Sequence, residues 1–417
     1  MAISPVLDIQ LPRVPTLFRC PISLELMKDP VTLSTGLTYD RSSIEKWFDD
    51  GHHTCPGTMQ LVKVRDLVPN HTLRRLIQEW CVANKSRGIE RIPTPKQPLD
   101  DEQASHLVRQ ISSAELSGRA KSRLLRNLRA SCKESEKNRK CIAGAGAIPA
   151  LSSLVSSFQP RISFDRPSNL EDLQCCEDAV AVLVILLPLE IESLRKSIIN
   201  PSLLAVLSWI LHRRNTEGQI NAARLLELVA TDDESKSMVG ATERLIPGLV
   251  KLVKEDSAYP RAVRASLTAL LAIVSCRKNL VKAVQGGVVP PLIELLSEAS
   301  RLNTERALAV LEFVARCAEG REALMDHSLS VPMLVKIILT VSDLASERAV
   351  GILLLMCQAD DSVVQAAASE GAFTQMILLI QADNTSETNH RARQFLKLLR
   401  GAVPRECMHD FAFTMPF

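Results

Sequence analysis

The side chains near the start of the chain that could do chemistry are thiols and imidazoles. Residues 17–83 carry three cysteines and three histidines, namely Cys20, Cys55, Cys81, His52, His53 and His71. A small domain held together by two zinc ions needs about eight such ligands at fixed spacing, and Ser23 stands where a second cysteine would follow Cys20. The sequence therefore excludes a two-zinc domain. One zinc ion held by Cys20, Cys55 and one of the paired histidines stays open as an alternative.

Hydrogen bonds and ion pairs are the expected replacement for metal in this stretch. The candidates are charged residues in or beside two loops, namely Glu25, Lys28, Asp29, Asp40, Arg41 and Asp66. We therefore predict no metal and no cofactor.

The elements that must position these groups are a hairpin and two helices. Alternating residues on either side of Gly36 predict a short β-hairpin over 31–39. Asp40 is placed to cap a helix that Gly51 ends, and Asn70 to cap a second helix. The apolar residues that these helices would turn inward are Ile44, Trp47, Phe48, Leu73, Leu76, Ile77 and Trp80. Such a unit is small for a domain that folds alone.

Short blocks in this stretch also match a known family in order and spacing. They are Phe18-Arg19-Cys20-Pro21-Ile22-Ser23, Asp29-Pro30-Val31, Thr38-Tyr39-Asp40-Arg41, Ile44-Glu45-Lys46-Trp47-Phe48, Cys55-Pro56 and Val68-Pro69-Asn70-His71-Thr72-Leu73-Arg74. Together they resemble the U-box of plant ubiquitin ligases. The resemblance implies a zinc-free, RING-like α+β domain with a shallow groove, formed by two loops and the central helix, for a ubiquitin-charged conjugating enzyme (E2).

Carried over from the family, the groove residues are Ile22 and Leu24 from the first loop, Trp47 from the helix and Pro56 from the second loop. A few apolar side chains in a polar rim suit a weak, exchangeable contact. The alternative is that all four are ordinary core residues. For Ile22 and Trp47 we favour partner contact, because the hairpin and the closing helix already supply enough apolar side chains to form a core without them. Leu24 and Pro56 are left open between the two.

The mechanism that the resemblance implies uses no nucleophile of this chain. A substrate lysine attacks the thioester on the E2, and the ligase supplies proximity and orientation. A covalent ligase would need an activated cysteine; only Cys55 lies near histidines, and the groove loop accounts for it. The family often places a long polar or cationic side chain at the position that is Met59 here, followed by Gln60. A thioether cannot donate a hydrogen bond, so either Gln60 takes that role or activation is weaker.

The rest of the chain is predicted to be a helical array behind a Pro-rich linker. Short segments of similar sequence recur along this part of the chain. Their equivalent positions, here called marks, are 247, 290, 332 and 374; three of them are prolines, and they are spaced by 43, 42 and 42 residues. Nineteen residues before each mark stands an apolar residue, namely Leu228, Leu271, Phe313 and Leu355. A period of about 42 with a Pro-initiated helix is typical of the armadillo type of α-solenoid. We expect five to six repeats and a mainly α fold.

Two features of the array bear on partners. About 15 extra residues early in the array predict a loop insertion near 156–175, which is either inert or a partner contact. We expect the Pro-initiated helices to line a concave groove for a protein substrate. Lys251, Glu294 and Lys336 stand at equivalent positions of those helices and alternate in sign. They are candidate substrate contacts, with solvated helix faces as the alternative.

Composition limits the other partners. The net charge is only +3, from 50 basic and 47 acidic residues, so the chain has no strong overall positive potential that would attract nucleic acid. Eleven cysteines without a Cys-x-x-Cys pair favour reduced thiols in the cytoplasm, with the nucleus or a peripheral association with membranes through partners as alternatives. The longest apolar run, 179–189, is too short for a membrane span, and the first residues lack the apolar core of a signal peptide.

These inferences predict five segments: an N-terminal extension 1–13, a U-box 14–88, a linker 89–100, an armadillo array 101–403 and a tail 404–417. The predicted function is an E3 ubiquitin-protein ligase that brings a charged E2 to lysines of a bound substrate. The resemblance also implies a role in stress, immune or hormone signalling, and a homodimer. The alternative is a non-catalytic armadillo scaffold or adaptor with a weak or inactive U-box.

Overall fold

A computed structural model of the 417-residue chain describes residues 14–62, 67–85, 99–113, 115–158, 170–189, 195, 197–255, 259–382 and 385–400. The chain divides into two compact units, Met1–Gln97 and Pro98–Phe417, and each is described by itself. The predicted segments 1–13 and 404–417, and residues 89–98 of the predicted linker, lie outside the described residues.

The first unit is built on a small antiparallel sheet. Strand β1 (Pro30–Thr32) pairs with β2 (Thr38–Asp40) on one side and with β3 (Val68–Pro69) on the other. The hairpin register sets Val31 opposite Tyr39. Helix α1 (Arg41–Asp49) follows β2, α2 (His71–Ala83) follows β3, and the short helix η1 (Thr16–Phe18) precedes the sheet. The hairpin and both helices agree with the sequence prediction, whereas β3 was not predicted.

The core of this unit lies between the sheet and the two helices. Its fully or almost fully buried side chains include Met27, Tyr39, Ile44, Phe48 and Ile77. Burying a side chain of this size stabilises a fold by about 1.5–3 kcal/mol. Asn70 caps α2 as predicted, since its Oδ1 accepts the backbone N–H of Leu73 at 3.0 Å. Leu76 is a correction, because it lies 45% exposed on the outer face of α2.

The second unit consists of stacked helices. They are α3 (Asp101–Ser112), α4 (Gly118–Glu134), α5 (Glu136–Gly144), α6 (Ala147–Ser157), α7 (Leu170–Leu186), η4 (Leu187–Leu189), α9 (Pro201–Leu211), α10 (Thr216–Val229), α11 (Asp233–Ala241), α12 (Leu245–Glu255), α13 (Pro260–Val274), η5 (Arg277–Asn279), α14 (Leu280–Gln285), α15 (Val289–Leu295), α16 (Arg301–Val314), α17 (Ala318–Asp326), α18 (Ser330–Ile337), α19 (Asp343–Cys357), α20 (Asp361–Ser369), α21 (Ala372–Gln381) and α22 (Ser386–Arg400). One continuous apolar core runs through them.

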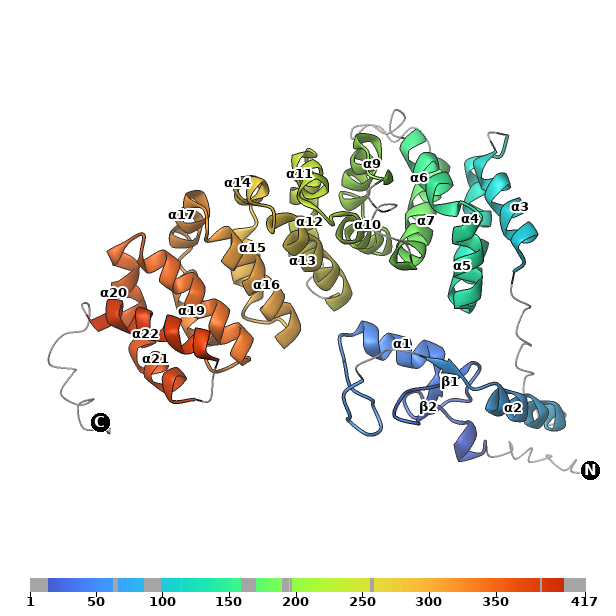
Figure 1. The fold of residues 1–417 in the computed structure, drawn as a ribbon, viewed down its shortest axis with the longest axis horizontal. Coiled ribbons are helices and arrows are strands. Elements are labelled where there is room, and N and C mark those ends of the chain that lie inside the picture. The colour runs from blue at the N-terminus through green and yellow to red at the C-terminus, as the bar shows by residue number, and fades with distance from the viewer. Residues whose placement is uncertain are drawn as a thin grey trace, which may run out of the picture. The chain divides into compact units, whose positions relative to one another are not determined.

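From α11 onward, the helices form groups of three, and the third helix of each group packs against the third helix of the next. This gives a layer in which α10, α13, α16, α19 and α22 contact one another in order. The array bends with α11, α14 and α17 along its outer edge and α13 and α16 along its inner edge (Figure 1). The prediction that the helices marked by Pro247, Pro290 and Pro332 line the inner face is therefore wrong, because these helices are α12, α15 and α18, the second helices of the groups.

The predicted insertion is shorter than 156–175. Helix α6 continues to Ser157 and α7 begins at Leu170, so both ends of the proposed loop are helical. The physical reason is burial: Leu173, Cys175 and Cys176 are buried in the first turns of α7, which packs on α4 and α6. Residues 159–169 lie outside the described residues.

The apolar residues of the array are divided among many short helices. In the described part of the chain, no single helix is both long and apolar enough to cross a bilayer. Helices α20 and α21 reach that length only together, and the chain bends by 78° between them. The apolar run at 179–186 ends α7, and its side chains are buried except for the half-buried Ile185.

Candidate functional site

Two loops of the first unit share one sequence pattern and one conformation. Residues 20–26 and 55–61 both read Cys-Pro-x-Ser/Thr-x-Glu/Gln-Leu. In each loop, the cysteine N–H donates to the carbonyl of the residue five positions on, and the residue four positions on donates to the cysteine carbonyl, all at 2.8 Å. An isolated antiparallel bridge closes each loop, Arg19 with Leu26 and Thr54 with Leu61. The loops are thus two copies of one turn.

The tips of these loops hold apolar side chains in solvent. Leu24 and Met59 occupy the same place in the two turns, with φ of 60° and 58°, and their exposed fractions are 70% and 69%. Positive φ is uncommon for residues other than glycine, and such residues cluster at functional sites. The pattern of an exposed apolar side chain on a strained backbone, occurring twice, marks these tips as a binding surface.

The cysteines of the loops act as hydrogen-bond acceptors. Cys20 Sγ accepts the backbone N–H of Asp40 at 3.3 Å. Cys55 Sγ lies 3.2 Å from the Oγ1 of Thr35, which donates to it, and 3.1 Å from the hydroxyl of Tyr39. Within the described ranges, no group of three or more His, Cys, Asp or Glu side chains is placed to hold a metal ion. The alternative of one zinc ion on Cys20, Cys55 and a histidine is therefore not formed.

Carboxylates brace the first loop against the sheet and helices. Asp29 pairs with Arg41 at 2.7 Å and with Arg74 at 3.1 Å, both half-buried. The carboxylate of Asp40 accepts the backbone N–H groups of Lys28 and Asp29 at 2.7 and 2.8 Å. Asp40 stands at the N-cap of α1 but makes no side-chain cap bond there. Asp29, Asp40 and Arg41 thus act as the predicted brace.

The other brace candidates contribute differently. Lys28 supplies only the backbone N–H that Asp40 accepts, and Glu25 supplies a backbone carbonyl to the first turn. Asp66 lies outside the described residues. Sequence reasoning missed Arg74, whose charge and helical position were visible but whose partner 45 residues away was not.

The hydrogen bonds around Cys55 shift two pKa values. Burial opposes ionisation of the Cys55 thiol, but hydrogen bonds from Thr35, Thr58 and Tyr39 outweigh it and lower its pKa to about 6. Burial, together with the hydrogen bond to Cys55, raises the pKa of Tyr39 to about 12. The thiol is fully buried, so the thiolate stabilises the second loop and is not presented to a partner.

The central helix is joined to the second loop through Trp47. Its Nε1 donates to the carbonyl of Thr54 at 2.8 Å, and its ring stacks on that of His52 with centroids 3.8 Å apart. Trp47 and Ile22 are both half-buried and pack against the core of the unit. Pro56 is half-buried as well. Ile22 and Trp47 therefore combine a structural contact with a surface open to a partner, which the two sequence alternatives treated as exclusive.

Comparison with known proteins agrees with this geometry. A model of the U-box domain matches residues 14–86, and a model of the plant U-box protein ARM repeat region matches residues 103–415. The chain belongs to the plant U-box proteins with armadillo repeats. It is 39% identical to U-box domain-containing protein 26 of Arabidopsis thaliana over 94% of this chain and 93% of that protein. It is 35% identical to E3 ubiquitin-protein ligase PUB22 of Arabidopsis thaliana over 92% of this chain and 94% of the relative.

Solved structures support the fold of the array. An engineered protein matches with a TM-score of 0.57 at 21% identity, covering 72% of this chain and 71% of the other. A computationally designed armadillo repeat protein for modular peptide recognition matches with a TM-score of 0.50 at 20% identity, covering 60% and 99%. At this identity, the likeness concerns the armadillo fold alone.

Met59 stands at the U-box position where the family often has a side chain that donates hydrogen bonds. Gln60 beside it is exposed, and its backbone N–H lies 3.4 Å from Thr58 Oγ1. The Gln60 side chain makes no hydrogen bond to another described residue. It is therefore available to a partner, while Met59 offers only an apolar surface.

The predicted substrate residues of the armadillo array lie on its second helices. Lys251 is on α12, Glu294 on α15 and Lys336 on α18. Glu294 and Lys336 are exposed, and Lys251 is half-buried. Because α13 and α16 form the inner edge of the array (Figure 1), these three residues lie on helices outside that edge. Their role as substrate contacts stays a prediction.

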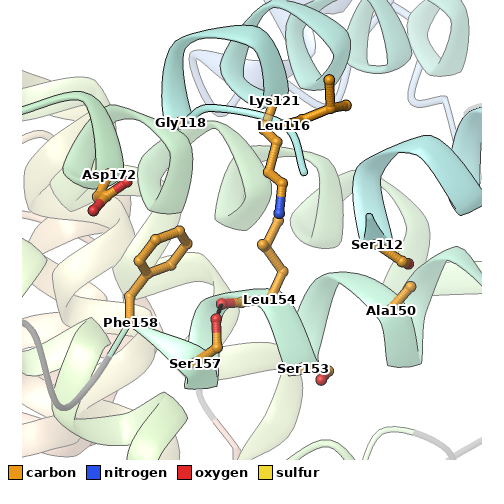
Figure 2. Close-up of a pocket in the computed structure, with 10 residues that line it drawn as sticks. All are labelled: Ser112, Leu116, Gly118, Lys121, Ala150, Ser153, Leu154, Ser157, Phe158 and Asp172. Atoms are coloured by element: carbon orange, nitrogen blue, oxygen red, sulfur yellow. Dashed lines mark hydrogen bonds between the residues drawn. The ribbon is translucent and has the colours of Figure 1, made fainter. Parts of the chain in front are cut away.

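A cavity of about 370 Å³ lies at the start of the array. Figure 2 shows the side chain of Lys121 reaching toward Leu154, with Phe158 and Asp172 to one side. Its ten lining residues include serines but no histidine or cysteine. No residue of the U-box loops is among these ten residues.

Proposed function

We propose that this protein is an E3 ubiquitin-protein ligase that binds a ubiquitin-charged E2 through its U-box and a protein substrate through its armadillo repeats. The observation that carries the proposal is the pair of exposed apolar tips, Leu24 and Met59, on two equivalent turns. Membership of the plant U-box family and the activity in the name of the relative PUB22 support it. Ile22, Trp47 and Pro56 complete the proposed E2 contact.

The proposed reaction needs no covalent intermediate on this chain. Cys55 has a lowered pKa but a fully buried thiol, so it is not placed to accept ubiquitin from an E2 thioester. The substrate lysine attacks the E2 thioester directly, and the ligase contributes by holding both partners close and oriented. Met59 or Gln60 then contacts the E2 with its ubiquitin and restricts the thioester to a reactive pose.

The proposed substrate is a protein that lies along the armadillo array. Each repeat contacts its neighbours, so the layer of third helices offers an extended surface. A role in stress, immune or hormone signalling belongs to the proposal through the family resemblance, and a cytoplasmic location belongs to it through the eleven cysteines without a Cys-x-x-Cys pair.

Reconstituted ubiquitination tests the E2 contact. The full chain is incubated with activating enzyme, ubiquitin and a broad panel of E2 enzymes, and self-ubiquitination is followed on gels. We expect ubiquitin chains to form with at least one E2. The double variant Leu24→Ala/Met59→Ala should undergo self-ubiquitination at least tenfold more slowly. Leu76→Ala is the matched control, because Leu76 is an exposed apolar residue on α2 outside the loops, and it should retain the full rate.

The alternative function has a distinct outcome. If no E2 of the panel yields chains while circular dichroism shows the fold to be intact, the protein is an armadillo scaffold or adaptor with an inactive U-box. Chains that form equally fast with the double variant would show that the loop tips are not the E2 contact.

A further inference from the structure

Four successive third helices of the array carry an arginine at the same position. These arginines, here called the arginine row, are Arg264 on α13, Arg306 on α16, Arg348 on α19 and Arg391 on α22. They are spaced by 42, 42 and 43 residues, which is the armadillo period. All four are half-buried. A repeated residue on consecutive packed helices makes a line across the array.

A second row runs beside the first. Seven residues after each arginine stands an apolar side chain, and these residues, here called the apolar row, are Leu271, Phe313, Leu355 and Leu398. Residues seven apart lie two turns on along the same helix face. The first three are half-buried and Leu398 is exposed. The third helices thus offer a charged stripe and an apolar stripe in parallel, and α13 and α16 lie along the inner edge of the array (Figure 1).

The arginines differ in what they already bind. Arg391 is neutralised, because it pairs with Glu312 at 3.2 Å and with Glu387 at 3.0 Å. Arg306 donates to the carbonyl of Leu302 at 3.3 Å, and Arg348 donates to the backbone carbonyl of Glu305. Neither has a carboxylate oxygen of a described residue within ion-pair distance.

One of the nearby acids, Glu305, is engaged elsewhere. The carboxylate of Glu305 pairs with Arg301 at 3.1 Å and accepts the hydroxyl of Ser342 at 2.7 Å. Burial lowers the pKa of Arg306, although Glu227 and Glu305 act in the opposite direction. Arg306 and Arg348 are thus half-buried guanidinium groups on consecutive third helices, without a carboxylate of a described residue in ion-pair distance, although Glu227 and Glu305 are near enough to act on the charge of Arg306. Such groups bind carboxylates and phosphates in a bidentate manner.

We propose that the inner face of the array binds an extended, anionic segment of a protein substrate. Acidic or phosphorylated side chains of that segment pair with Arg306 and Arg348, and its apolar side chains contact the apolar row. Packed helices lie about 8–10 Å apart, which equals roughly three residues of extended chain. The segment therefore carries a negative charge at about every third residue, with apolar side chains between. This inference rests on the proposed function, since it names the chemistry of the substrate.

The row does not suit a nucleic acid. The apolar row, which a polyphosphate backbone would leave unused, favours a peptide.

Fluorescence anisotropy with the full chain tests the proposal directly. The probe is the fluoresceinated peptide GSDVTDVTDVTDGS, in which aspartate recurs every third residue and valine favours an extended backbone. The matched probe GSKVTKVTKVTKGS differs only in the sign of charge. We expect the acidic probe to bind at least tenfold more tightly than the basic one. A third probe with phosphoserine in place of aspartate assigns the anion: tighter binding points to phosphorylated substrates, and equal or weaker binding to acidic ones.

Variants locate the binding to the row. Arg306→Gln/Arg348→Gln should weaken the acidic probe at least tenfold. The control Arg277→Gln/Arg400→Gln removes the same two charges from exposed positions outside the row and should change affinity less than twofold. Thermal melting of each variant checks the fold.

Three outcomes would overturn the proposal. They are equal binding of the acidic and basic probes, unchanged affinity in Arg306→Gln/Arg348→Gln, and tighter binding of a fluoresceinated oligothymidylate than of the peptide. Self-ubiquitination of the unmodified chain is measured separately, so that a chain which binds the probe but forms no ubiquitin chains would contradict the proposed ligase activity and leave this inference standing.

Discussion

Leu24 and Met59 are equivalent residues of two copies of one turn. Each donates its backbone N–H to the carbonyl of the cysteine four residues earlier at 2.8 Å, and each has φ near +60°. A glycine would relieve the left-handed backbone at these positions, yet both turns keep a large apolar side chain there in solvent. This cost in backbone strain is understandable if the side chains serve binding.

Under the proposed function, the side chain at position 59 should set the rate of ubiquitin transfer. Met59→Arg should speed self-ubiquitination several-fold, because a guanidinium donates hydrogen bonds where a thioether cannot. Gln60→Ala tests whether the neighbouring amide already supplies the donor, and should slow the reaction at least threefold if it does. Initial rates with a single E2 at saturating concentration measure both. A Met59→Arg chain with an unchanged rate would mean that position 59 does not act on the thioester.

Trp47 stabilises the U-box as well as offering a surface. Trp47→Phe keeps an aromatic ring but loses the hydrogen bond to Thr54, so the free energy of unfolding should fall by about 1 kcal/mol. Trp47→Ala also loses the stacking on His52 and the packing against the core, and should cost about 3 kcal/mol. Urea unfolding measures both. Equal stability of Trp47→Ala and the unmodified chain would show that the residue serves the partner alone.

The brace should hold the first loop without metal. Asp40→Ala leaves the backbone N–H groups of Lys28 and Asp29 without their acceptor, which should cost roughly 2–3 kcal/mol. Asp50→Ala, at an exposed position after α1, should change stability little. EDTA should leave the melting temperature of the unmodified chain as it is. A drop in that temperature on chelation would reveal a structural metal.

Much of this fold follows from local chemistry. The alternation around Gly36, the cap at Asn70 and the 42-residue period each predict an element that the structure contains. These features are local or strictly periodic, so they can be read without knowing which segments meet. The pairing of β3 with β1 brings Val68 to Thr32. These residues are far apart in the sequence, and β3 is only two residues long, which is too short to leave an alternating pattern.

The site was harder to predict for the same reason. The repeat of Cys-Pro-x-Ser/Thr-x-Glu/Gln-Leu was visible, but only the backbone shows that Leu24 and Met59 share a left-handed conformation. In the array, the period shows that Lys251 and Glu294 are equivalent, but not which helices form the inner edge. That is decided by the packing of α10, α13 and α16 on one another. The arginine row had the same period and was missed because it stands on the third helices.

The pH dependence of U-box stability should reveal the Cys55 thiolate. Its pKa is about 6 in the folded chain and ordinarily 9.0, so between these values the unfolded chain binds the additional proton. The free energy of unfolding should therefore rise from pH 6 to pH 9, by up to about 4 kcal/mol, and the stabilisation is lost as the pH falls through 6. The lowered pKa of Cys20 acts in the same direction.

Fluorescence can follow that transition in the first unit alone. Two of the three tryptophans, Trp47 and Trp80, lie in the U-box. The tryptophan fluorescence of a Trp209→Phe variant therefore reports only on the U-box. In that background, Cys55→Ser should flatten most of the rise with pH, because a serine hydroxyl does not ionise in this range. An equally steep rise in Cys55→Ser would assign the effect to other groups.

Close packing in the array makes one glycine irreplaceable. A Cβ added at Gly320 would lie 2.0 Å from the carbonyl oxygen of Val314, so the start of α17 would have to move away from α16. Gly320→Ala should lower the free energy of unfolding by about 3 kcal/mol, as overpacking against backbone does. Gly144→Ala is the matched control, because a Cβ there meets nothing within 4 Å, and it should stabilise α5 by about 0.5 kcal/mol. Urea unfolding followed by circular dichroism at about 222 nm, where helix dominates, compares the two; similar midpoints would show that α16 and α17 can separate at little cost.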